Sequence, residues 1–286
     1  MKALETGHQP ARPAAQKTVK TRNLLKEIST SIEDRPSAGV IYGPSGVGKS
    51  TTCGGIPKAV VQPMVDENTW GNLKRAGVVP GKLATLPPAE TFTDVMDGMR
   101  SLLDQDHDYK SYVLDSVTSF ERKLHEHVCR ESFNNDWTDR GFMGYMRGYE
   151  VALTPLREAL DLCDRLRDEK QMSVFLIGHS VVKTHRDPRL SPFDRHICDL
   201  HHKSWSVIHR WCDFVFFMDF VVDVTEEAGR GKGHGGDERQ FMVTYDASYD
   251  AKNRFGLTES ISAGDAGSDA WANISKAVKT ARKASA

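Results

Sequence analysis

Residues 43–50 read Gly-Pro-Ser-Gly-Val-Gly-Lys-Ser and match the pattern G-x-x-x-x-G-K-[ST] in full. The glycines of this pattern let successive backbone N–H groups turn into one concavity, where they bind phosphate oxygens. The lysine reaches the β- and γ-phosphates, and the serine hydroxyl is a ligand for Mg²⁺. The pattern therefore predicts that ATP and Mg²⁺ are bound by Gly43, Pro44, Ser45, Gly46, Val47, Gly48, Lys49, Ser50 and Thr51.

The residues on either side of this loop predict a strand before it and a short helix after it. Residues 38–42 form an apolar run that suits a buried parallel strand. A helix can begin at Ser50, but Gly54, Gly55 and Pro57 must end it early. This strand–loop–helix context favours a phosphate-binding loop over a chance glycine-rich turn.

Composition places few limits on the function. The 286 residues carry a formal net charge of −1, so nucleic-acid binding would have to come from a local basic patch. No apolar run approaches the roughly 18 residues that span a membrane, and the N-terminus lacks the apolar core of a signal peptide. Five widely spaced cysteines without a C-x-x-C pair are typical of reduced thiols in a cytoplasmic protein.

Apolar runs and helical patterns alternate along the chain, which predicts an α/β fold with a mainly parallel central sheet flanked by helices. The expected strands are 38–42, 60–65, 82–86, 111–115, 172–178, 213–218 and 239–245. The expected helices are 67–76, 91–104, 117–132, 145–169, 199–211 and 268–283. The glycine-rich residues 226–240 are expected to form a flexible loop at the tip of a late antiparallel hairpin. We divide the chain into a disordered basic tail (1–20), one nucleotide-binding domain (21–265) and a C-terminal helix (266–286).

Three further polar positions follow expected strands. Asp115 ends the run Ser-Tyr-Val-Leu-Asp and would help to hold Mg²⁺, although an aspartate here can also cap a helix. Glu67 follows the second strand and is the favoured catalytic base, with Asp66 as the alternative. The competing interpretation is that both are solvated carboxylates in a turn, without a catalytic role. His179 follows the strand 172–178 and could sense the γ-phosphate, although a lone histidine is often structural.

A basic segment follows His179. Residues 184–198 contain two prolines and no periodicity, so we expect a long loop there. Its candidate nucleic-acid contacts are Lys183, Arg186, Arg189, Arg195 and Lys203, and Phe193 or Trp205 could stack on bases. A mobile polar loop is the competing interpretation. The cluster His196-x-Cys198-x-x-His201-His202 does not have the two ligand pairs that a zinc site needs.

Residues 250–257 read Asp-Ala-Lys-Asn-Arg-Phe-Gly-Leu. Together with the features above, this run resembles the RecA-type P-loop ATPases, and Lys-Asn-Arg-Phe-Gly is similar to the signature of the Sms-type DNA-repair ATPases. The chain also resembles phage-encoded AAA-domain nucleotide-binding proteins, which include core-only, RecA-like single-strand annealing proteins. The run 200–217 is also similar to a stretch found in that family. The likeness covers roughly residues 36–262.

The resemblance implies roles for individual residues. Lys49, Ser50 and Asp115 would contact nucleotide and metal, and Glu67 would be the catalytic glutamate. In the family that glutamate lies two residues after the aspartate, where this chain has Asn68. Lys252 and Arg254 would reach the γ-phosphate of a neighbouring subunit, which requires a head-to-tail ring or filament. The segment after His179 would contact single-stranded DNA.

Three functions follow as hypotheses. The first is an ATPase that acts on single-stranded DNA in phage recombination, annealing or repair, in the cytoplasm of the host cell. The second is a phosphotransferase, in which the 184–198 segment would act as a lid over a small acceptor. The third is an ATP-dependent interaction protein that does not bind DNA. The Lys-Asn-Arg-Phe-Gly run favours the first.

Overall fold

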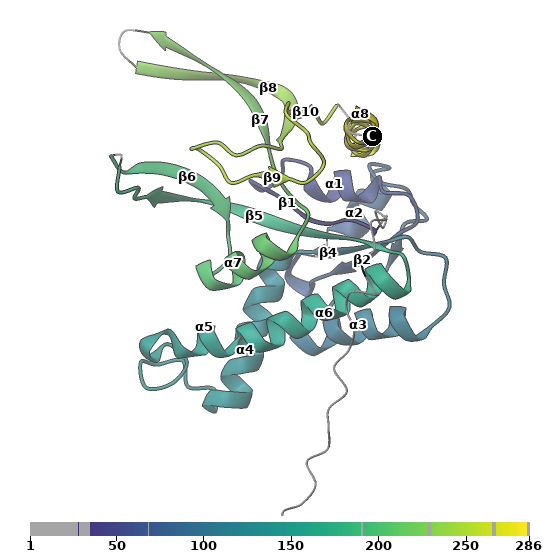
Figure 1. Ribbon diagram of the computed structural model, residues 1–286, viewed down its shortest axis with the longest axis vertical. Coiled ribbons are helices and arrows are strands. Elements are labelled where there is room, and N and C mark those ends of the chain that lie inside the picture. The colour runs from purple at the N-terminus through teal and green to yellow at the C-terminus, as the bar shows by residue number, and fades with distance from the viewer. Residues whose placement is uncertain are drawn as a thin grey trace, which may run out of the picture. The chain divides into compact units, whose positions relative to one another are not determined.

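The computed structural model describes residues 28, 35–67, 69–189, 191–227, 230–264 and 267–284 (Figure 1). The chain divides into two compact units, Met1–Asp34 and Arg35–Ala286, and every element named below belongs to the second. The predicted tail 1–20 lies outside the described residues.

A mainly parallel sheet forms the centre of this unit, as the sequence predicts. Its path runs β10-β8-β7-β1-β5-β4-β2-β3, with β6 paired to β5 and β9 paired to β7. The parallel strands are β1 (Ala38–Gly43), β2 (Ala59–Pro63), β3 (Ala84–Thr85), β4 (Ser111–Asp115), β5 (Ser173–His185) and β7 (Phe214–Glu227). The antiparallel additions are β6 (Phe193–Cys198), β8 (Arg230–Met242), β9 (Lys252–Asn253) and β10 (Ile261–Ser262). The predicted α/β class and late antiparallel hairpin are confirmed.

Helices cover both faces of the sheet (Figure 1). Successive β1 residues point to opposite sides, so Val40 packs into one core cluster and Ile41 into the other. On the Val40 side lie α3 (Phe92–Asp104), α4 (Val117–Phe133), α6 (Leu153–Glu169) and α7 (His202–Trp211). On the Ile41 side lie α1 (Lys49–Gly54), α2 (Trp70–Arg75) and α8 (Gly267–Ala284). The strands are therefore buried on both faces, which explains their continuous apolar runs.

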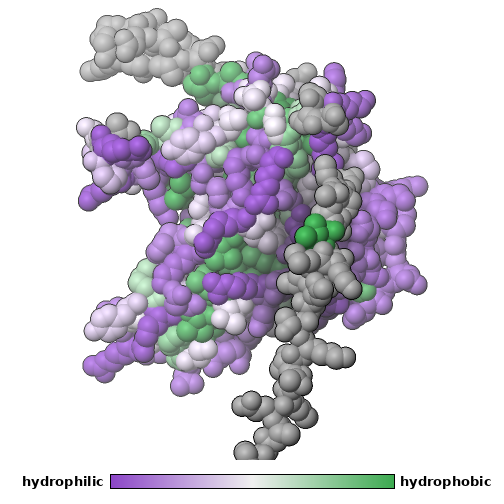
Figure 2. Space-filling model, in the orientation of Figure 1, coloured by the Kyte–Doolittle hydropathy of each residue, from purple (hydrophilic) through white to green (hydrophobic). Residues whose placement is uncertain are grey.

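Two segments that were expected to be loops are strands. β5 continues past His179 and pairs with β6 from Ser180↔Cys198 to His185↔Phe193, so the expected 184–198 loop is largely a hairpin, the β5–β6 arm (residues 180–198). Likewise β8 pairs with β7 through most of residues 226–240. In both cases long-range pairing to a β-branched partner strand overrides weak local propensity. In Figure 2 the end of the β5–β6 arm, at the left, is hydrophilic.

The expected helix 145–169 is interrupted. A 3-10 turn, η3 (Gly144–Met146), and a short helix, α5 (Arg147–Val151), precede α6. Tyr145 and Met146 have left-handed backbones, with φ of 49° and 61°, which no continuous helix accommodates. Pro155 lies in the first turn of α6, where its missing N–H has no helical partner to lose. The proline therefore marks a helix start within the apolar stripe.

All five cysteines are buried and unpaired. No helix in the described part of the chain combines the length and the apolar character needed to cross a lipid bilayer.

One buried carboxyl on α4 predicts how stability depends on pH. Glu121 is 8% exposed and accepts a hydrogen bond from the His201 backbone N–H (2.9 Å). Burial raises the pKa of Glu121 to about 7, although this hydrogen bond opposes the effect. The nearby His125 is also buried, which lowers its pKa to about 4, so it supplies no positive charge at neutral pH. Glu121 is therefore protonated more readily in the folded state than in the unfolded chain.

We expect Glu121→Gln to stabilise the protein at alkaline pH. Because the native pKa lies above the ordinary value, ionisation favours unfolding; this penalty is absent below about pH 4 and grows as the pH rises through 7. The variant should gain about 2–3 kcal/mol in the free energy of unfolding near pH 8.5, and the gain should fall below about 1 kcal/mol near pH 5. Urea titrations at both pH values test this. A variant that is equally destabilised at both would show that the side chain acts through packing alone.

Candidate nucleotide-binding site

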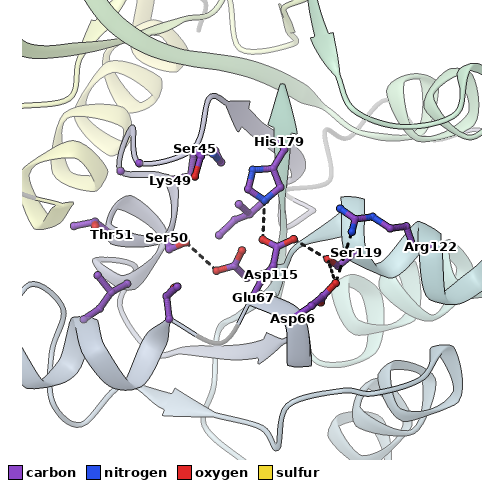
Figure 3. A pocket seen from close by; sticks show the side chains of 15 residues that line it. Ser45, Lys49, Ser50, Thr51, Asp66, Glu67, Asp115, Ser119, Arg122 and His179 are labelled. Atoms are coloured by element: carbon purple, nitrogen blue, oxygen red, sulfur yellow. Dashed lines mark hydrogen bonds and ion pairs between the residues drawn. The ribbon is translucent and has the colours of Figure 1, made fainter. Parts of the chain in front are cut away.

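The carboxyl ends of three parallel strands, β1, β2 and β4, and the middle of a fourth, β5, meet at one pocket of about 630 Å³ (Figure 3). The register places Gly43 beside His179, and Asp115 beside both Ile177 and Pro63. The phosphate loop after β1, the end of β4, the turn after β2 and the middle of β5 therefore line the same space. Gly43 and His179 are 136 positions apart in the sequence, and the pairing of the strands brings them to the same site.

The phosphate loop has the backbone that its glycines allow. Gly46 and Gly48 have positive φ values of 79° and 108°. A side chain at Gly43 would lie 2.1 Å from the Met218 carbonyl oxygen, so this position also needs glycine. α1 begins at Lys49 directly after the loop, and the N-terminus of a helix favours a bound anion. The short helix ends at Gly54, as expected.

Lys49 is buried at the floor of the pocket. Its Nζ donates to the Gly43 carbonyl oxygen (2.9 Å) and the Pro44 carbonyl oxygen (2.8 Å). Burial lowers the pKa of Lys49, while the carboxylates of Asp115 and Glu67 act in the opposite direction. The loop thus holds the ammonium group in place, and the same group would bind phosphate in the loop.

Ser50 and Asp115 form the pair that suits Mg²⁺. The Ser50 hydroxyl donates to Asp115 Oδ2 at 2.8 Å, joining α1 to the end of β4. Burial raises the pKa of Asp115 to about 6; the Ser50 hydrogen bond opposes this effect and the Glu67 carboxylate reinforces it. A hydroxyl and a carboxylate are hard oxygen donors of the kind that Mg²⁺ prefers, and a nearby cation would favour the ionised aspartate.

Glu67 lies in the turn η2 (Val65–Glu67), and three hydrogen-bond donors fix its side chain. Its Oε1 accepts from the Ser116 hydroxyl (2.5 Å) and the Ser119 hydroxyl (2.7 Å), and its Oε2 lies 2.7 Å from His179 Nε2. Burial raises its pKa, but the bonds from His179, Ser116 and Ser119 together outweigh burial and lower the pKa to about 2. Glu67 is therefore a carboxylate in a single orientation, which suits the positioning of a water molecule.

Ser116 and Ser119 were not predicted from the sequence as site residues. Ser116 caps α4 by accepting from the Ser119 backbone N–H (3.2 Å), and both hydroxyls turn toward η2. Ser119 also donates to Asp66 Oδ2 (2.9 Å), so it joins the two candidate bases. The sequence shows the helix cap at Ser116. It does not show the contact with Glu67, because that contact depends on the pairing of β2 with β4.

Lys252 and Arg254 lie at the opposite end of β1. β9 pairs with Phe214 and Val215 at the start of β7, where β7 in turn pairs with Gly39 and Val40. Lys252 donates to the His209 carbonyl oxygen. Arg254 is 3.1 Å from Asp213 Oδ1 and its side chain is 58% exposed. Neither residue lines the pocket of its own chain.

The five candidate nucleic-acid contacts fall into two groups. Lys183, Arg186 and Arg189 are exposed on the β5–β6 arm, and Arg189 pairs with Asp187 (3.0 Å). Arg195 is turned inward and donates to the Tyr249 carbonyl oxygen (2.8 Å). Lys203 lies on α7 and pairs with Glu150 (2.5 Å). The arm thus presents three of the five cations to solvent.

The histidines and cysteine near 196–202 do not gather around one point. Across the described residues, no group of three or more His, Cys, Asp or Glu side chains is arranged to hold a metal ion. His201 instead stacks on Tyr149, with ring centroids 4.0 Å apart.

A family model described as "AAA domain" matches residues 35–255, most of the chain and the whole of the site. The chain belongs to this AAA-domain family. The match covers the phosphate loop, Asp115, His179 and the Lys-Asn-Arg-Phe-Gly run up to Phe255. A comparison with curated protein sequences gives no match.

The solved structures that are similar to this AAA-domain chain include the following two. The flagellar accessory protein FlaH from Methanocaldococcus jannaschii has a TM-score of 0.41 and 11% identity, over 85% of this chain and 91% of FlaH. The RadB recombinase has a TM-score of 0.43 and 15% identity, over 80% of this chain and 88% of RadB. At these TM-scores neither likeness bears on activity.

Proposed function

We propose that this AAA-domain protein is a RecA-type ATPase that hydrolyses ATP and couples hydrolysis to single-stranded DNA, in phage recombination, annealing or repair. The observation that carries the proposal is the Glu67–His179 contact at 2.7 Å, beside the Ser50–Asp115 pair. It joins a fixed carboxylate at the phosphate end of the pocket to the strand that continues into the β5–β6 arm.

Each pocket residue has a defined task in this scheme. The loop N–H groups and Lys49 bind the phosphates, and Ser50 and Asp115 would hold Mg²⁺. Mg²⁺ would neutralise charge on the β- and γ-phosphates. Glu67 orients the attacking water. Because its pKa is low, Glu67 is a weak base, and its main contribution is to position the water and not to remove a proton from it in the ground state. The alternative base, Asp66, shares Ser119 with Glu67.

His179 is the proposed link between nucleotide and DNA. Its backbone N–H donates to the Thr118 hydroxyl (3.1 Å), and its ring contacts Glu67. The next residue, Ser180, begins the β5–β6 arm. A γ-phosphate that draws the His179 ring toward it and away from Glu67 would bias the arm at its base. The exposed cations of the arm supply phosphate contacts for DNA.

The binding of DNA by the arm is tested with the double variant Lys183→Ala/Arg186→Ala. Loss of two phosphate contacts should weaken binding of a labelled single-stranded oligonucleotide with MgATP present. It should also reduce the slope of log K against log salt by about 1.4. Arg100→Ala, which removes an exposed arginine on α3, is the control. DNA affinity that is unchanged in the double variant, or ATP turnover that depends on a small acceptor, would contradict the proposal.

The proposed trans role of Arg254 predicts complementation between inactive variants. We call Arg254 the finger, because it would reach into the site of a neighbouring subunit. Arg254→Ala should not hydrolyse ATP because each site lacks the finger of its neighbour. Lys49→Ala should not hydrolyse ATP because its own site is defective. In an equimolar mixture, about a quarter of the interfaces join an intact site to an intact finger, so about a quarter of the wild-type rate should return. The ATPase rate of the mixture is the measurement. A rate equal to the average of the two variants alone would remove the finger assignment.

A further inference from the structure

Arg239 lies beside the phosphate loop, on the side away from the carboxylates, and is not among the residues assigned above. β8 pairs with β7 so that Arg239 is opposite Phe220. The guanidinium carbon lies 5.3 Å from the centroid of the Phe220 ring. A methyl group built on Gly48 would be 3.6 Å from Arg239 Nη1. The arginine therefore flanks the N-terminus of α1, where the loop would bind phosphate.

The hydrogen bonds of Arg239 are incomplete. Its Nε is buried and has no hydrogen-bond partner within the described part of the chain. A buried donor without a partner is costly unless a ligand supplies an acceptor. Its neighbours are instead an aromatic ring and the phosphate loop. A planar cation on a ring leaves its second face available for stacking.

Strand order indicates which part of a nucleotide would meet it. From β1, the residues proposed for Mg²⁺ and water lie on β5, β4 and β2, all to one side; β7 and β8 lie to the other. If the γ end of a triphosphate lies at Asp115 and Glu67, its other end points away from these carboxylates, toward the β7–β8 side. The nucleoside end then emerges beside Arg239.

We propose that Arg239, supported by Phe220, is a stacking platform for the base and ribose of the bound nucleotide. This inference rests on the proposed nucleotide binding at residues 43–51. Cation–π and stacking contacts recognise the π face that all bases share, so the platform should hold ATP and GTP alike. Arg239 would then add affinity through the nucleoside, while Lys49 and the loop act on the phosphates.

The test compares a ligand that has a base with one that lacks it. Dissociation constants for MgATP and for magnesium tripolyphosphate are measured by calorimetry on the wild type, Arg239→Ala and Phe220→Leu. We expect Arg239→Ala to weaken MgATP about tenfold and tripolyphosphate less than twofold. Phe220→Leu, which keeps an apolar side chain, should show the same pattern with a smaller loss. Arg165→Ala, an exposed arginine on α6, is the matched control.

Two results would overturn the assignment. Equal losses for MgATP and tripolyphosphate would place Arg239 on the phosphates or in the support of the loop. Unchanged affinity for both would show that it has no ligand role. If the wild type binds tripolyphosphate but neither variant alters MgATP affinity, the platform fails while the phosphate site stands. If the wild type binds neither ligand, the proposed function itself fails.

Discussion

Replacing Lys49 by alanine is expected to lower the rate of ATP hydrolysis at least about 100-fold. Lys49 is the cation at the floor of the pocket, and its contacts with the Gly43 and Pro44 carbonyl oxygens fix it beside the phosphate position. Alanine removes the charge that would bind the β- and γ-phosphates and would stabilise the transition state. Phosphate release by both proteins, at an MgATP concentration that saturates the wild type, is the measurement.

Two comparisons separate this loss from misfolding. Lys58→Ala removes an exposed lysine that pairs with Asp108 at 3.0 Å, and it should hydrolyse ATP at the wild-type rate. Thermal unfolding of Lys49→Ala should stay cooperative, with a midpoint close to that of the wild type. A folded Lys49→Ala protein with wild-type turnover would show that hydrolysis occurs elsewhere or comes from a contaminant.

Glu67→Gln is expected to lower kcat by a factor of about 100 to 10,000 while MgATP affinity changes less than threefold. Glutamine keeps the size of the side chain and can still accept from Ser116 and Ser119, but it has no negative charge to orient and activate water. The three donors that lower the Glu67 pKa to about 2 show how strongly the site favours the carboxylate. Single-turnover hydrolysis and nucleotide binding, measured separately, resolve the two effects.

Asp66→Asn is the matched control for this variant. Asp66 lies next in sequence and also accepts from Ser119 (2.9 Å), but it does not contact His179 in the way Glu67 does. We expect a decrease in kcat of less than about fivefold. If Asp66→Asn instead shows the large loss and Glu67→Gln the small one, Asp66 is the base and the Glu67–His179 contact is structural.

The sequence predicted the centre of the molecule well because its signals there are local. The phosphate-loop pattern, the apolar runs of β1, β4 and β5, and the early end of α1 at Gly54 each depend on residues close together in the chain. Asp115 was placed correctly at a strand end, and its contact with Ser50 follows from the sheet order of a parallel fold.

The features that the sequence did not predict depend on long-range pairing. The β5–β6 arm and the length of β8 require a partner strand, and the glycines of 231–236 point locally to a loop. Ser119 reaches Glu67 across 52 positions, and Arg239 meets Gly48 through the β7–β8 pair. Such contacts have no periodic signature, so residue types alone cannot locate them.

The account depends most directly on the binding of Mg²⁺ and a nucleoside triphosphate to the pocket formed by the phosphate loop, Asp115 and Glu67. Isothermal titration of MgATP into the folded wild-type protein measures this. We predict one site per chain, with a dissociation constant of about 1–100 μM, and no detectable binding to Lys49→Ala. Absence of binding by the folded wild type at millimolar MgATP, or equal binding by Lys49→Ala, would contradict the account.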